Sequence, residues 1–181
     1  MKKIFLIMAM AAAMVACNSG KKCVVEGDIT GIEDGVVTLS EPQRGGEVLA
    51  ETQMENGKFR FVLEDVEPQL CAVNVGEDTV AMIFTENGKV KIRGSVAEVV
   101  TIEGTLANEA YNAFNADMTL LNQRYAQAAD DEARLALREE YDAMLDGAIE
   151  QNLGNVFGVT LLLEAKGIKL TEGKVYYNGY S

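Results

Sequence analysis

The periodicity of apolar residues changes once along this chain, and this change constrains the fold more than any other feature of the sequence. Over residues 23–104, apolar residues alternate with polar ones, as Phe59 and Phe61 do with the basic residues beside them. Alternation with a period of two is typical of strands that bury one face. Over residues 105–165, apolar residues recur every three or four positions, which is typical of amphipathic helices. The sequence therefore predicts a β-domain followed by a helical segment.

The alternating part of the chain contains eight short runs that are suited to strands. Turn-forming stretches such as EDG, RGGE and GED separate these runs. We expect strands over residues 23–29, 35–39, 47–54, 58–63, 69–75, 80–85, 89–93 and 98–103. Short strands at this spacing are typical of sandwiches and barrels. The expected fold is mainly β: an antiparallel β-sandwich or barrel-like domain of about eight short strands, followed by a C-terminal antiparallel helical hairpin.

One short sequence occurs twice in the β-domain, as ENGKFRF at 55–61 and as ENGKVKI at 86–92. A repeated motif could indicate a binding site, but turn chemistry accounts for it more simply. Asn-Gly between two apolar strands supplies the positive φ angles that a type I′ hairpin turn requires. We therefore expect a hairpin turn at each copy.

The helical segment divides into two long helices and a short third one. Thr105 is suited to the N-cap of the first helix. The second helix begins near Asp130 and carries its charged residues on the face opposite its apolar side, as a solvated helix does. The QAADD loop between them is short, so these two helices should pack antiparallel. A third helix is expected over 155–165, and residues 166–181 form a tail whose pattern is too short to assign.

The N-terminus has the organisation of a secretory signal. Two lysines precede an apolar run of twelve residues, which is too short to cross a bilayer core about 30 Å thick. The three residues before Cys17 are Met-Val-Ala, which resemble the lipobox of bacterial lipoproteins. The alternative is cleavage after Ala13 by ordinary signal peptidase. Residues 1–16 are thus expected to be a lipoprotein signal peptide, and residues 17–22 a lipidated cysteine with its tether.

Lipidation of Cys17 predicts both a location and a partner. Acyl chains on Cys17 would attach the protein to a membrane, because two or more chains hold a protein stably. The expected location is the bacterial cell envelope, at the outer membrane, facing the periplasm or the cell surface. Removal of the two lysines in the signal lowers the formal net charge from −12 to −14 and leaves fourteen basic residues.

Cys23 and Cys71 are the other two cysteines, and both occupy core-facing positions of expected strands. Two interpretations remain open for them. They are either buried free thiols or the partners of a structural disulfide, which persists in an oxidising envelope. Neither lies in a C-x-x-C motif, so the sequence does not indicate a dithiol active site.

Composition excludes several classes of function. The chain has no histidine, which rules out Ser-His-Asp and Cys-His catalysis and histidine-ligated zinc. Its net charge disfavours non-specific binding to nucleic acid. Three acidic groups, at 64–67, 77–78 and 130–132, lack the spacing of a calcium loop and are assigned to solvated loops and helix caps. We therefore expect no catalytic residue, no metal site and no cofactor.

Basic residues gather on the outward side of two expected strands. The five residues are Lys58, Arg60, Lys89, Lys91 and Arg93. If the two strands are neighbours, these residues form a basic stripe suited to an anion or an acidic partner. The alternative is that they pair with acidic residues across strands and protect sheet edges. Both interpretations remain open at this stage.

The order of several core and turn motifs resembles a known family. These motifs are Gly35–Leu39, Asn56–Phe61, Phe84–Gly88 with Val90 and Ile92, and Gly104-Thr105 with Asn108 and Tyr111. They resemble the uncharacterised β-domain at the N-terminus of many Gram-negative lipoproteins, which usually precedes a thioredoxin-like domain of the AhpC/TSA or TlpA type. The resemblance covers about residues 23–165 and implies no catalytic residue. This chain, however, has no tryptophan and no C-x-x-C motif.

Two functional hypotheses follow. The first is a membrane-anchored, non-enzymatic lipoprotein module for interaction or ligand binding. The second, which the family resemblance suggests, is an accessory or truncated remnant of a thioredoxin-like thiol–disulfide oxidoreductase. Its partner would be a separate thioredoxin-like protein, whereas the first hypothesis allows another envelope protein as partner.

Overall fold

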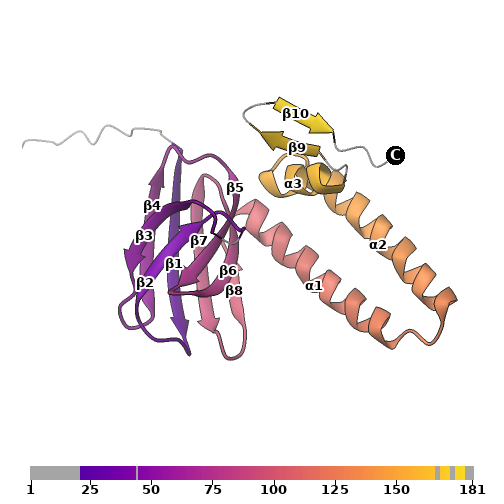
Figure 1. The fold of residues 1–181 in the computed structure, drawn as a ribbon, viewed down its shortest axis with the longest axis horizontal. Coiled ribbons are helices and arrows are strands. Elements are labelled where there is room, and N and C mark those ends of the chain that lie inside the picture. Colours follow the sequence, from indigo (N-terminus) through magenta and orange to yellow (C-terminus); the bar gives the residue numbers. More distant parts are fainter. Residues whose placement is uncertain (1–20, 44, 166–167, 172–173, 178–181) are drawn as a thin grey trace, which may run out of the picture.

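A computed structural model describes residues 21–43, 45–165, 168–171 and 174–177 (Figure 1). The segment expected to be a signal peptide, Cys17 and most of the expected tether therefore lie outside the described residues. The described chain is a β-domain followed by helices. The eight strands of the β-domain are β1 (Lys22–Thr30), β2 (Val36–Ser40), β3 (Val48–Gln53), β4 (Lys58–Glu64), β5 (Gln69–Val75), β6 (Asp78–Thr85), β7 (Gly88–Ser95) and β8 (Val100–Glu103). The expected mainly β fold is confirmed, and each strand lies where the alternation predicted one.

The eight strands form two four-stranded sheets, in the orders β4-β1-β7-β8 and β3-β2-β5-β6. The sheets pack face to face as a sandwich, and no closed barrel forms, which decides between the two expected architectures (Figure 1). One pairing differs from the expected antiparallel arrangement, because β1 and β7 run parallel. Parallel neighbours need a long crossover. Here the chain builds the whole second sheet between these two strands.

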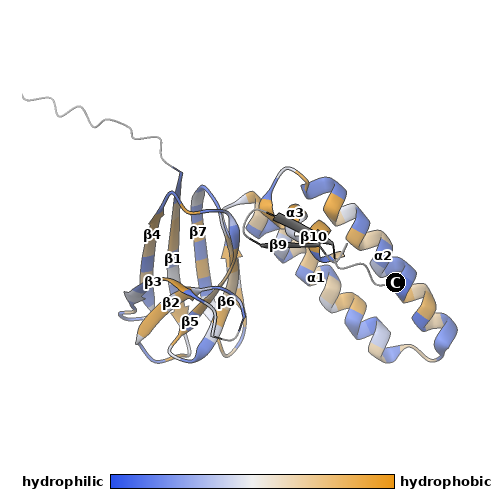
Figure 2. Ribbon diagram, turned by 45° about the horizontal axis from the view of Figure 1, so that its top comes forward, coloured by the Kyte–Doolittle hydropathy of each residue, from blue (hydrophilic) through white to orange (hydrophobic). Residues whose placement is uncertain are grey.

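The core of the sandwich comes from the inward residues of each strand. Figure 2 shows hydrophilic and hydrophobic positions alternating along β4, β1 and β7. Fully buried side chains from both sheets meet in one cluster, including Val25, Val73 and Ile92. Burying a side chain of this kind stabilises the fold by about 1.5–3 kcal/mol. The period-two pattern is therefore the direct cause of the layered architecture.

The two ENG sequences differ in conformation. Asn56 and Gly57 have φ angles of 52° and 76°, as a type I′ turn requires. In the second copy only Gly88 has a positive φ, 140°, and it already begins β7. Both copies carry the chain from one sheet to the other, from β3 to β4 and from β6 to β7. The hairpin prediction is therefore wrong for the second copy, and the first is a tight turn between sheets.

Asp34 holds the first of these turns in place. Its carboxylate accepts hydrogen bonds from the backbone N–H groups of Asn56, at 2.5 Å, and Gly57, at 2.9 Å. A Cβ atom at Gly57 would lie 2.2 Å from the carbonyl oxygen of Ile29. Glycine is needed here both for the positive φ and for this close approach of two backbones.

Two long helices form the expected antiparallel hairpin beside the sandwich (Figure 1). They are α1 (Leu106–Gln127) and α2 (Asp131–Asn152), and a third helix, α3 (Val156–Ala165), follows them. In the tail, β9 (Ile168–Thr171) and β10 (Lys174–Tyr177) pair antiparallel, an element that the sequence did not predict. Asp130 caps α2 by accepting a hydrogen bond from the N–H of Ala133 at 2.9 Å.

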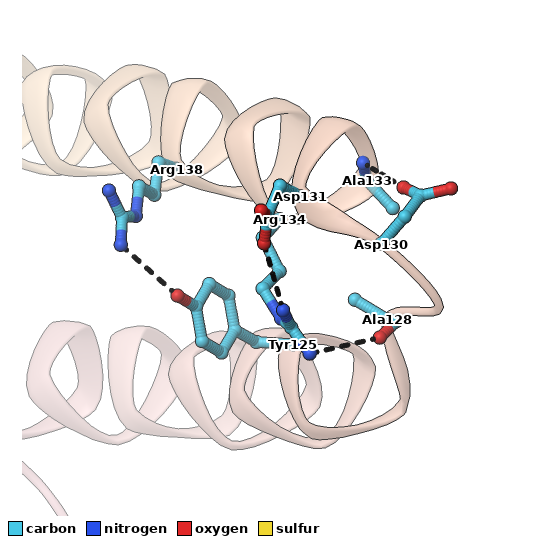
Figure 3. Close-up of polar contacts among 7 residues, drawn as sticks. All are labelled: Tyr125, Ala128, Asp130, Asp131, Ala133, Arg134 and Arg138. Carbon is cyan, nitrogen blue, oxygen red and sulfur yellow. Dashed lines mark hydrogen bonds and ion pairs between the residues drawn. The ribbon is translucent and has the colours of Figure 1, made fainter.

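Polar contacts close the tip of the helical hairpin (Figure 3). Arg138 donates to the hydroxyl of Tyr125 at 3.2 Å, and Arg134 donates to Asp131 at 3.0 Å. Near the tip, Arg124 makes two hydrogen bonds to Glu140, at 2.5 and 2.8 Å. Exposed ion pairs of this kind each contribute only about 0.2–1 kcal/mol. Apolar packing must therefore supply most of the stability of the hairpin.

That packing is a second apolar cluster between the sandwich and the bases of the helices. Phe84 of β6 contacts Tyr111 of α1 and Phe157 of α3, with ring centroids 5.5 and 5.9 Å apart. Phe114 of α1 lies 5.7 Å from Phe157. Edge-to-face aromatic pairs add about 0.5–1.5 kcal/mol each beyond the area that they bury. Phe84 therefore joins the sandwich to α1 and α3.

A buried amide completes this junction. Asn108 is fully buried, and its side chain accepts a hydrogen bond from the N–H of Phe84 and donates one to the carbonyl of Phe84, both at 2.8 Å. It also donates to the hydroxyl of Thr105 at 2.8 Å. Thr105 occupies the predicted N-cap position, but its side chain does not cap the helix. Glu86 takes that role, with its carboxylate accepting from the N–H of Ala107 at 2.8 Å.

Candidate functional site

The five basic residues singled out in the sequence lie on one face of the sandwich. Lys58 and Arg60 project outward from β4, and the other three project from β7. The two strands are not direct neighbours, because β1 lies between them. We call the outward surface of the β4-β1-β7-β8 sheet the basic face. The condition for a single continuous basic stripe is therefore not met, and the five residues form two rows separated by β1.

Acidic residues of β1 separate the two basic rows. In register, Glu26 lies between Arg60 and Lys91, and Asp28 lies between Lys58 and Arg93. The carboxylate of Glu26 lies 2.7 Å from the amine of Lys89 and 3.5 Å from the guanidinium of Arg60. That of Asp28 lies 3.9 Å from the amine of Lys58.

These ion pairs involve Lys58, Arg60 and Lys89, so two of the five basic residues, Lys91 and Arg93, take no part in them. The hydrogen bond from Lys89, with the charges of Lys89 and Arg60, holds the pKa of Glu26 below its ordinary value. Glu26 therefore stays ionised and keeps its two basic neighbours engaged. Within the described part of the chain, no carboxylate oxygen lies within 4.0 Å of the charged nitrogens of Lys91 or Arg93.

The basic face is positively charged overall although the protein is acidic. Its outward basic residues are Lys22, Lys58, Arg60, Lys89, Lys91 and Arg93, and its outward acidic residues are Glu26, Asp28, Glu64 and Glu103. Six positive and four negative charges leave an excess of two positive charges. The whole chain carries −12. This contrast makes the basic face the candidate functional site.

A shallow hollow of about 560 Å³ opens on this face. Its charged lining includes Lys58, Arg60, Lys91 and Arg93, together with the acidic residues of β1. Thr52 and Gln53, from the end of β3, add neutral hydrogen-bonding groups. The hollow therefore combines unpaired cations with polar side chains at the edge where the two sheets meet.

Cys23 and Cys71 lie in the interior, away from the basic face. Both are free thiols in this structure, fully buried in the sandwich core on β1 and β5. Burial raises the pKa of Cys71 to about 11, and the pKa of Cys23 is raised for the same reason. A thiolate, which exchange chemistry and metal binding require, is therefore disfavoured at both positions, and strongly so at Cys71.

Both thiols should be unreactive in the folded protein. At pH 8, a thiol with a pKa of about 11 is ionised to about one part in a thousand. We expect residues 18–181 to react with 5,5′-dithiobis(2-nitrobenzoic acid) at least about a hundredfold more slowly than the same chain unfolded in guanidinium. A fast phase of one thiol or more in the folded protein would contradict the buried arrangement.

The same shift predicts how stability depends on pH. Because folding raises the pKa of Cys71, its contribution to stability is complete below the ordinary pKa of 9.0 and is lost as the pH rises toward about 11. The free energy of unfolding should therefore fall between pH 9 and pH 11, and Cys71→Ala should make that fall smaller. Urea unfolding at a series of pH values measures both.

The acidic groups noted in the sequence are dispersed. Glu64 lies 3.9 Å from Lys22, Asp130 caps α2, and Asp131 pairs with Arg134. In the described residues, no three His, Cys, Asp or Glu side chains are grouped so that they could hold a metal ion. Within the same residues, no helix has the length and apolar character needed to span a bilayer.

Sequence reasoning missed Glu26 and Asp28, the acidic residues that organise the basic face. The signal was present, because both alternate with the apolar residues of the first strand and so had to project outward. What the sequence lacked was the strand order. Without it, the acidic residues could not be placed between the two basic rows.

Comparison with known protein families finds a match over the β-domain. Residues 23–111 match the family described as "Domain of unknown function (DUF4369)". The matched segment covers the eight strands of the sandwich, apart from Lys22 at the start of β1, and extends into α1 as far as Tyr111. It therefore includes Asn108 and the other residues that join α1 to Phe84. No curated protein and no solved structure matches the chain.

Proposed function

We propose that this protein is a lipid-anchored, non-enzymatic module of the bacterial cell envelope that binds an anionic partner. Its sandwich corresponds to a domain of unknown function, so the proposal depends on the surface of this chain. The observation that carries it is the basic face, which has a positive excess on a strongly acidic protein. A surface with an excess of charge of one sign attracts and orients partners of the opposite sign.

The position of Cys17 supports the anchored part of the proposal. The lipobox-like sequence before this cysteine and the resemblance to envelope lipoproteins both favour acylation. Only four residues separate Cys17 from β1, which begins at Lys22 and is the strand at the centre of the basic face. A stretch of six residues spans at most about 20 Å, so acylation would keep the sandwich close to the membrane.

Replacement of Cys17 tests the anchor. We expect Cys17→Ser to abolish labelling by radioactive palmitate and to move the protein from the membrane fraction to the soluble fraction, because the thioether-linked diacylglycerol cannot form. Cys23→Ser is the matched control, since it removes a cysteine six positions away and should retain the label. Palmitate labelling that persists in Cys17→Ser would show that the anchor is elsewhere.

A further inference from the structure

We infer that the anionic partner is an acidic segment of another protein, and that Lys91 and Arg93 bind alternate carboxylates of that segment in an extended conformation. This inference rests on the proposed function and names the chemistry of the partner. Three features of the basic face support it: the spacing of the two cations, the way in which β1 already occupies this face, and the mixed lining of the hollow.

The first feature is spacing. Lys91 and Arg93 alternate along β7, so both project from the outer face of the sheet. Alternate residues of a strand are about 6.6 Å apart along its axis, and this spacing is the same in any extended peptide. A segment with acidic residues at every second position therefore matches this pair. In a helix, side chains about 5–6 Å apart on one face are three or four residues apart in sequence, so acidic residues at every second position share a face only when the segment is extended.

The second feature is the arrangement of β1. Its own acidic residues, Glu26 and Asp28, alternate in this way and lie in register with Lys91 and Arg93 on β7. Their ion pairs, however, go to Lys89 and to the basic residues of β4. On this face, β1 is thus an acidic strand held between two basic rows. Lys91 and Arg93 form no ion pair within the described residues, so they can bind the carboxylates of a second acidic strand.

The third feature is the lining of the hollow, which favours carboxylates over phosphates. Three acidic residues, Glu26, Asp28 and Glu55, line it beside the cations. They repel a phosphate, with its charge close to −2, more strongly than they repel a carboxylate with a charge of −1. Thr52 and Gln53 supply hydrogen-bonding groups that a peptide backbone can use.

Fluorescence anisotropy of a labelled peptide tests the inference on the full-length protein in a neutral detergent. The probe is a twelve-residue peptide of alternating Glu and Thr, and its matched control has Gln in place of each Glu. We expect the Glu-Thr peptide to bind, with an affinity that falls as salt is added, and the Gln-Thr peptide not to bind. Equal binding of both peptides would overturn the inference.

Charge-neutral variants locate the contact. The double variant Lys91→Gln/Arg93→Gln should weaken binding of the Glu-Thr peptide about tenfold, since it removes two charge-assisted contacts. The control is Arg124→Gln/Arg134→Gln, which lowers the positive charge equally but at the tip of the helical hairpin. We expect this control to bind like the wild type. Equal loss in both double variants would show a general charge effect and would overturn the inference.

Direct titration tests the other sources of negative charge. Inorganic phosphate, and heparin as an anionic glycan, are each titrated into the wild-type protein without peptide, and into Lys91→Gln/Arg93→Gln as the control. If either binds the face and the Glu-Thr peptide does not, the partner is not an acidic peptide segment, whereas the proposal of an anionic partner stands. Self-association that Lys91→Gln/Arg93→Gln abolishes, with no peptide binding, would also overturn the inference, because a second copy would then be the partner.

Membrane attachment and peptide binding are tested independently, so the proposed function and this inference can be contradicted separately. The Cys17→Ser chain is assayed in parallel, and it should bind the Glu-Thr peptide with wild-type affinity, because Lys91 and Arg93 lie on β7 and Cys17 is not part of the basic face. Peptide binding without membrane attachment would contradict only the anchored part of the proposed function. Membrane attachment without peptide binding would contradict only this inference.

Discussion

Asn108→Ala is expected to lower the free energy of unfolding by about 3–5 kcal/mol, because each buried polar group left without a partner costs about 1–3 kcal/mol. The substitution would leave three such groups: the N–H and the carbonyl of Phe84, and the hydroxyl of Thr105. Asn108 itself is fully buried, so water cannot replace its amide without opening the junction.

Urea unfolding followed by far-UV circular dichroism measures this loss as a fall in the transition midpoint. Asn122→Ala is the matched control, because Asn122 is exposed on the same helix and should change the midpoint very little. If Asn108→Ala cost no more than Asn122→Ala, the amide could not be what holds α1 to β6.

Phe157→Ala is expected to cost about 3–5 kcal/mol, the usual range for truncating a buried phenylalanine. Phe157 is buried and contacts the aromatic rings of Phe84, Tyr111 and Phe114. Loss of the Phe157 ring would leave a cavity between these three aromatic side chains. The sandwich core does not include this residue. The substitution should therefore lower the local stability of the helices much more than that of the sheets.

Native-state hydrogen exchange can separate these two effects, because it reports the opening free energy of each segment. In Phe157→Ala, amides of α2 and α3 should lose protection, whereas those of β1 and β5 should keep most of theirs. Leu153→Ala is the control, since Leu153 is 54% exposed just beyond α2. An equal loss of protection in strands and helices would show instead that the two apolar clusters unfold as one unit.

Much of the candidate site was accessible from the sequence, although its chemistry was not. The outward direction of Arg60 and Lys91 follows from alternation along a strand, which is a local property. Their distance from each other depends on strand order, which joins residues about thirty positions apart. The pairing of Lys89 with Glu26 is likewise a consequence of the parallel β1–β7 contact. No local pattern in the sequence specifies that contact.

By itself the sequence determined the classes of element and their order. Periodicity of two and then of three to four, with turn residues between the runs, placed eight strands and three helices, because the backbone geometry of each element fixes which side chains share a face. The same local reasoning placed the start of the second helix near Asp130, which caps α2 in the structure, and it placed Cys23 and Cys71 in the core.

Only the tertiary structure decided which elements meet. It made the second ENG sequence a crossing between sheets, and it set the acidic residues of β1 between two basic rows. In the tertiary structure the carboxylate of Glu86 caps α1 by accepting from the N–H of Ala107, twenty-one residues later in the chain. The side-chain amide of Asn108 likewise accepts a hydrogen bond from the backbone N–H of Phe84. The physical reason is the same in each case. Hydrogen bonds and ion pairs between distant residues depend on how whole sheets pack, and that packing follows from burial of the entire core, which no short stretch of sequence specifies.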